Sequence, residues 1–186
     1  MDLSADDPWQ HEREEDPDTA HLMEALGRVV AASAMLEHLL RSVVCSLIGS
    51  PYSIITVASM QTGALIEQCR ALIKVHRVIS DQTARDELAD LLGDAARLSQ
   101  LRNRFVHDVW AVKPGQGMAQ LEQHRKSHRM TARDRTYDEL ARCACDIEML
   151  SSRLGMWRRF IPPELKGIDA DLRWLDGAGA MSANDE

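Results

Sequence analysis

Three side chains with complementary chemistry lie in one short stretch of the sequence, an Arg-Asn-x-x-x-His segment formed by Arg102, Asn103 and His107. An Arg guanidinium can hold a phosphate through two parallel hydrogen bonds, and an imidazole can transfer protons near neutral pH. An amide between them can orient either group. Together these groups could cleave a phosphodiester without a metal ion.

The spacing alone is a weak signal, because Arg70 and His76 fit a looser form of the same pattern. Two features distinguish the first match. Arg102 is followed by Asn103, one of only two Asn residues in the chain. His107 falls at the end of a predicted helix, where a reactive group can be reached, whereas His76 falls on an apolar helical stripe. We therefore expect His76 to be a structural histidine.

The composition predicts one helical domain. A chain of 186 residues can bury one core, and its residues are 45% apolar but only 4% aromatic, which favours aliphatic helices over sheets. No apolar run approaches the roughly 18 residues that a membrane span needs, and the acidic N-terminus is unlike a signal peptide. The sequence therefore predicts a cytoplasmic protein without membrane contact.

The motifs of several other chemistries are absent from the sequence. It contains no Glu-x-x-His pair, no CxxC pair and no glycine-rich phosphate loop, so it predicts neither a metal site nor a cofactor. The four Cys residues mostly fall on or beside apolar stripes. Buried, reduced thiols are the favoured interpretation over a disulfide or a metal site.

The net charge is distributed unevenly. Residues 1–18 carry eight acidic side chains and one Arg, which accounts for the whole net charge of −7. Such a segment is typical of disorder, and it could also mimic nucleic acid and cover a basic site. We therefore expect residues 1–17 to form an acidic disordered leader ahead of a single domain at 18–163, with a tail at 164–186.

Apolar periodicity predicts four long helices. The predicted spans are Thr19–Leu47, Ser53–Ile79, Gln82–Val106 and a last helix from the Thr136–Glu139 capping box to Ile161. Gly93 and Asp94 mark a place where the third helix could break. The expected fold is all-α, an antiparallel four-helix bundle with a small β-hairpin between the third and fourth helices.

The segment after His107 predicts the hairpin and a basic loop. Residues 109–112 are β-prone, residues 114–117 suit a turn, and residues 118–123 could return as a second strand. Residues 124–135 then carry five Lys or Arg against one Asp. They could form a solvated loop or a track for a phosphate backbone. Trp110 could stack on a base or simply cover the end of the helices.

Helical geometry sets the direction of the candidate groups. At 100° per residue, Asn103 and His107 lie nearly opposite the core positions Leu98 and Phe105, and Arg102 flanks the core. The candidate groups therefore point away from their own core. They are either ordinary solvated side chains, or they face a cleft or a second subunit.

The motif resembles the Arg-x(4–6)-His signature of the HEPN superfamily, in which Asn often follows the Arg. The likeness in helix order and motif placement runs from about Asp18 to Ile161, although the specific part is only six residues. It implies a metal-independent endoribonuclease that cleaves single-stranded RNA through 2′-hydroxyl attack and acts as a homodimer. It also implies a toxin or phage-defence role, often with a neutralising partner protein.

The resemblance assigns roles to residues. His107 is the expected general acid/base, Arg102 the stabiliser of phosphorane charge, and Asn103 the group that orients Arg102 or the phosphate. The expected RNA-binding residues are Arg104, Lys113, Arg125, Lys126 and Arg129. A non-catalytic helical module that binds a protein, nucleotide or RNA partner is the alternative.

Overall fold

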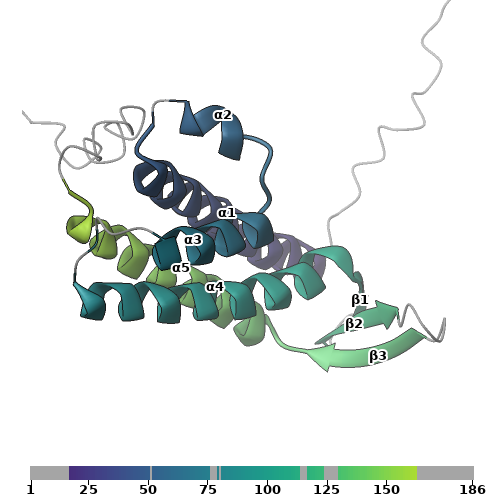
Figure 1. Ribbon diagram of the computed structural model, residues 1–186. Helices are drawn as coiled ribbons and strands as arrows, with labels where there is room; N and C mark the ends of the chain where they lie inside the picture. The colour runs from purple at the N-terminus through teal and green to yellow at the C-terminus, as the bar shows by residue number, and fades with distance from the viewer. Residues whose placement is uncertain are drawn as a thin grey trace, which may run out of the picture.

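The computed structural model describes residues 17–50, 52–75, 79, 81–113, 117–123 and 130–162, and these are mostly helical. Within them the chain forms five α-helices, one 3-10 turn and a small antiparallel sheet (Figure 1). The helices are α1 (Pro17–Ile48), α2 (Ser53–Val57), α3 (Thr62–Val75), α4 (Gln82–His107) and α5 (Tyr137–Trp157). The strands are β1 (Val109–Lys113), β2 (Gly117–Gln123) and β3 (Met130–Arg135), and the turn η1 is Arg158–Phe160. Residues 1–16 of the expected acidic leader and the expected tail at 164–186 lie outside the described residues, whereas Pro17 is the first residue of α1.

The core lies among the four long helices. Helix α1 packs against α3 and α5, and α4 packs against the same two helices from the other side (Figure 1). Aliphatic side chains fill most of this core, with Phe105 and Trp157 as its largest buried aromatic residues. The low aromatic content thus leads to interlocking Leu, Val and Ile stripes, as the periodicity predicts.

Helix α1 is the longest of the described helices and the most apolar of the four long ones. Its stripe of Leu22, Val29, Leu36, Leu40 and Val43 is buried against the other helices. Contrary to the sequence expectation, α1 is long and apolar enough to cross a membrane, with a mean hydropathy of 1.4 over its best window. The residues of that window are 44% buried within the protein, and a core helix of a soluble protein meets the same criterion. The criterion is therefore weak evidence for a span.

The single helix predicted for residues 53–79 is wrong, since the chain forms α2 and α3 with a break between them. Side chains of α1 stabilise the break: Arg41 donates a hydrogen bond to the Met60 carbonyl at 3.2 Å, and Glu37 accepts one from the Thr62 hydroxyl at 2.6 Å. The bond from Arg41 satisfies the Met60 carbonyl, which a continuous helix would satisfy internally. Periodicity alone does not reveal such tertiary contacts.

Helix α4 carries the Arg-Asn-x-x-x-His segment and runs unbroken through Gly93. Asp81 caps its start by accepting from the Thr83 amide at 2.9 Å. Its last residue is His107, and the amide of Asp108 closes the final turn on the Arg104 carbonyl at 3.2 Å. The helix therefore ends at the position where the motif ends.

The predicted hairpin has a third strand. Strand β1 pairs with β2, and β2 pairs with β3, so the antiparallel order is β1-β2-β3. Residues 130–135, expected to belong to a basic loop, form β3, in which Arg135 pairs with Met118 and is buried. The capping box that starts α5 is confirmed, because Thr136 and Glu139 exchange both of its hydrogen bonds.

Candidate functional site

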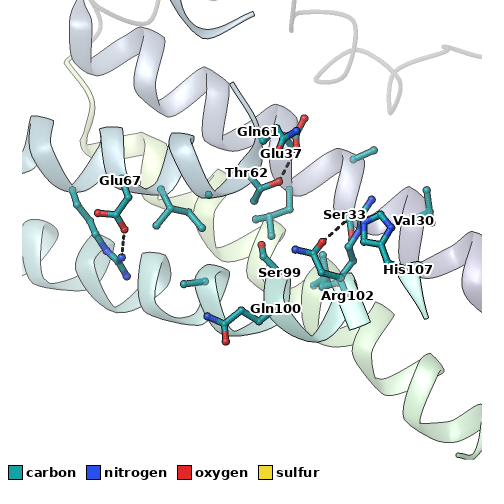
Figure 2. A pocket seen from close by; sticks show the side chains of 18 residues that line it. Val30, Ser33, Glu37, Gln61, Thr62, Glu67, Ser99, Gln100, Arg102 and His107 are labelled. Atoms are coloured by element: carbon teal, nitrogen blue, oxygen red, sulfur yellow. Dashed lines mark hydrogen bonds and ion pairs between the residues drawn. The ribbon is translucent and has the colours of Figure 1, made fainter. Parts of the chain in front are cut away.

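A cavity of about 910 Å³ lies between α1, α3 and α4, and Arg102, Asn103 and His107 all line it. Its other lining residues include Ser33 and Glu37 of α1, Thr62 at the start of α3, and Ser99 of α4 (Figure 2). Its volume falls within the range of ordinary ligand sites. The expected possibilities for the outward face of α4 are a solvated surface, a cleft or a second subunit, and the structure shows that these residues line a cleft within one chain.

Arg102 and Asn103 form a pair on the lining of this cavity. Arg102 Nη1 donates a hydrogen bond to Asn103 Oδ1 at 3.0 Å, and this bond is exposed. This leaves the amide nitrogen of Asn103 as a donor. The Arg102 Nε atom is enclosed and has no hydrogen-bond partner among the described residues. An anion bound here would meet guanidinium and amide donors that are already oriented.

His107 is the last residue of α4 and is exposed at the cavity mouth. Trp110, three residues later, turns back to the helix end: its Nε1 donates to the Phe105 carbonyl at 2.8 Å, and its ring lies 6.1 Å from that of Phe105. Trp110 therefore covers the end of α4, which the sequence analysis gave as the alternative to stacking on a base. It also fixes the backbone next to His107.

A buried polar network that sequence analysis missed anchors this helix end to the sheet. Gln120 is completely buried, and its Nε2 donates to the Arg104 carbonyl at 2.9 Å and to Asp108 Oδ2 at 2.8 Å. Gln120 Oε1 accepts from Arg135 Nε at 2.7 Å, and Arg135 also pairs with Glu139. The Asp108 carboxylate is thus bound to the sheet. No sequence signal marks Gln120, because its neighbours are 12 to 16 residues away along the chain.

The opposite wall of the cavity carries a second ordered group, Glu37. Its carboxylate accepts from Arg41 and from the Thr62 hydroxyl. Burial alone would raise the pKa of Glu37, but the hydrogen bonds from Thr62 and the nearby Arg41 charge lower it below its ordinary value. This carboxylate is therefore ionised at neutral pH and fixed in position.

The expected RNA-binding residues are not all gathered at the cavity. Arg104 is exposed on α4 but does not line the cavity, and Lys113 ends β1, its side chain lying outside the described residues. Arg125, Lys126 and Arg129 also lie outside the described residues, as does His76. The cavity's other cationic residue is Arg70, which pairs with Glu67 and donates to the Leu92 carbonyl at 3.5 Å.

The four thiols are free and, except for Cys145, buried. Burial raises the pKa of Cys69 to about 12, and burial together with the charge of Asp146 raises that of Cys143 to about 11. Within the described residues, no group of three His, Cys, Asp or Glu side chains is arranged to hold a metal ion.

No protein-family model, curated protein or solved structure matches this chain.

Proposed function

We propose that this protein is a metal-independent endoribonuclease that acts on single-stranded RNA. The observation that supports this function best is the presence of Arg102, Asn103 and His107 on one cavity wall, with Asn103 bound to Arg102 at 3.0 Å. A phosphate bound there would accept hydrogen bonds from the N–H groups of Arg102 and Asn103 and would lie next to the His107 imidazole. Donors and a proton-transfer group are what phosphodiester transesterification requires.

The reaction follows from these groups. His107 accepts the proton of the ribose 2′-hydroxyl as its oxygen attacks the adjacent phosphorus. Arg102 and the Asn103 amide stabilise the negative charge that develops on the phosphorane oxygens. The bond from phosphorus to the 5′-oxygen then breaks and that oxygen takes up a proton, which leaves a 2′,3′-cyclic phosphate and a 5′-hydroxyl.

The proposed assembly is a homodimer. His107 is exposed at the mouth of the cavity, so a second copy could supply the imidazole that protonates the leaving oxygen. In this proposal the four long helices form an antiparallel four-helix bundle in each copy, and Arg104 and Lys113 with the basic residues 125, 126 and 129 hold the strand. The biological role would be that of a cytoplasmic toxin or phage-defence effector controlled by a neutralising protein.

The proposed activity is tested by incubating purified protein with single-stranded RNA in EDTA. Wild type should release products with a 2′,3′-cyclic phosphate, and DNA of the same sequence should resist because it lacks the nucleophile. His107→Ala should lower the rate by about 10²–10⁴-fold. His21→Ala changes an exposed histidine that does not line the cavity, and it should retain full activity.

The controls separate catalysis from contamination and misfolding. His107→Ala should unfold in urea within about 0.5 kcal/mol of wild type, because the residue is exposed. Equal cleavage by wild type and His107→Ala would reveal a contaminating nuclease. Absence of cleavage by properly folded wild-type dimer would refute the proposed activity.

One observation favours the alternative, a non-catalytic module that binds a nucleotide, RNA or protein partner. The cavity contains the carboxylates of Glu37 and Glu67 as well as the cations of Arg70 and Arg102. Such a balanced lining suits a ligand with both charged and neutral polar groups. Tight nucleotide or RNA binding without any cleavage would favour this alternative.

A further inference from the structure

The α1 wall of the cavity presents hydrogen-bond acceptors. Ser33 and Glu37 are four residues apart, so they lie on the same face of α1. The Ser33 hydroxyl donates its hydrogen to the Val29 carbonyl at 2.7 Å. Ser33 Oγ can therefore only accept from a ligand in the cavity.

Glu37 extends this acceptor surface with a fixed carboxylate. Its Oε1 atom accepts from Arg41 Nη2, and its Oε2 atom accepts from the Thr62 hydroxyl. A carboxylate offers about four lone-pair sites, so these two bonds leave acceptor capacity for a ligand. The side chain is 29% exposed and lines the cavity, so a ligand can reach it.

The α4 wall has the opposite character. Arg102 has only donors, and Asn103 adds its amide N–H groups, since its oxygen faces Arg102. Apolar side chains of Leu36, Ile66 and Ile147 also line the cavity. A ligand that fits this lining has an anionic group at one end, donor groups at the other, and an apolar body between them.

We infer that the cavity selects a nucleotide whose base carries an exocyclic amino group, and that Ser33 and Glu37 are the residues that read it. The phosphate lies at Arg102 and Asn103, the flat ring contacts the apolar lining, and the amino group donates to α1. Cytosine and uracil provide the closest comparison. The cytosine N4 amino group is a natural donor to a carboxylate, whereas uracil presents a carbonyl oxygen there and is repelled. This inference rests on the proposed RNA-directed function and defines its base preference.

The test uses ribonucleoside 3′-monophosphates and the full chain, since these probes contain no cleavable phosphodiester. Isothermal titration should show that cytidine 3′-monophosphate binds about tenfold more tightly than uridine 3′-monophosphate. Glu37→Gln replaces the acceptor-only group by an amide that can also donate, so the two affinities should become similar. Ser33→Ala should reduce the preference in part, and it is a mild change on a helix, which keeps the test valid if Glu37→Gln folds poorly.

Glu24→Gln is the matched control. Glu24 is an exposed carboxylate on the same helix as Glu37 and does not line the cavity, so the base preference should remain that of wild type. Equal affinities for the two nucleotides in wild type, or no binding of either at millimolar concentration, would overturn the inference even if RNA is cleaved. A preference that depends on Glu37 without RNA cleavage would support the inference while refuting the proposed nuclease.

Discussion

Gln120 and Arg104 join the sheet to the end of the motif-bearing helix: Gln120 Nε2 donates to the Arg104 carbonyl at 2.9 Å across 16 residues of sequence. The same amide nitrogen binds Asp108, the residue that follows His107. The position of His107 relative to Arg102 thus depends on a side chain of β2.

Replacing Gln120 by Leu should lower the free energy of unfolding by about 1–3 kcal/mol, because Arg135 Nε loses its buried acceptor and the Arg104 carbonyl loses a donor. Urea unfolding monitored by circular dichroism measures this. Gln82→Ala is the control, since Gln82 is exposed and its side chain donates a hydrogen bond to its helical neighbour Asp86 at 2.8 Å. Equal stability of wild type and Gln120→Leu would mean that the network has no net stabilising effect.

The hydrogen bond between Arg102 and Asn103 predicts that the two residues act as a unit. Arg102→Lys keeps the charge but loses the planar guanidinium, which can donate two parallel hydrogen bonds. Asn103→Ala removes the amide that orients the Arg102 side chain. Each single change should lower kcat/KM for RNA cleavage, and the double variant should be little worse than the poorer single one. The double-mutant cycle formed by these variants should give a coupling energy of about 0.5–3 kcal/mol between the two residues. Strictly additive losses would show that Asn103 does not act through Arg102.

The lowered pKa of Glu37 predicts that the stability of the fold depends on pH. Its pKa is lower in the folded protein than in the unfolded chain, so the unfolded state binds more protons as the pH falls. The stabilisation is complete above the ordinary pKa of 4.5 and is lost as the pH falls through the folded value. The difference in unfolding free energy between wild type and Glu37→Gln should therefore shrink from pH 7 to pH 3. A difference that stays constant with pH would show that the Glu37 charge is not involved.

The cysteines should react in an order set by burial. The thiolate is the reactive form, and the high pKa values of Cys69 and Cys143 leave little thiolate at pH 8. Iodoacetamide should therefore modify the half-buried Cys145 first, and should reach Cys69 only after unfolding. Peptide mass mapping with and without urea measures this order. Rapid labelling of Cys69 in the native protein would contradict the packing around α3.

The parts of the fold that follow from local pattern could be predicted from the sequence. The apolar stripe of α1, the start of α4 at Gln82 with its end within one residue, and the capping box at Thr136 depend on residues a few positions apart, and the structure confirms them. The break between α2 and α3 depends on Glu37 and Arg41, which belong to another helix. Periodicity within residues 53–79 therefore predicted one helix where there are two.

In the candidate site, too, local features could be predicted and long-range ones could not. Helical geometry predicted that Asn103 and His107 point away from their own core, but α1 and α3 form the surface that these residues face. Its lining depends on long-range packing, so Ser33 and Glu37 could not be identified as part of it. Strand β3 was missed because its exposed residues carry no alternating apolar pattern, and only Arg135 is buried.

The contact between α1 and α5 has a consequence for synthesis on the ribosome. The Tyr137 hydroxyl donates to the Asp18 carbonyl at 2.8 Å across 119 residues, and Ile147 of α5 lines the cavity. During translation, the apolar stripe of α1 therefore emerges long before α5 exists, and a chain that ends before α5 lacks Ile147 in the lining of the cavity. Messages truncated before the codons of α5 would yield chains without a complete site, so an assembled cavity requires translation through α5.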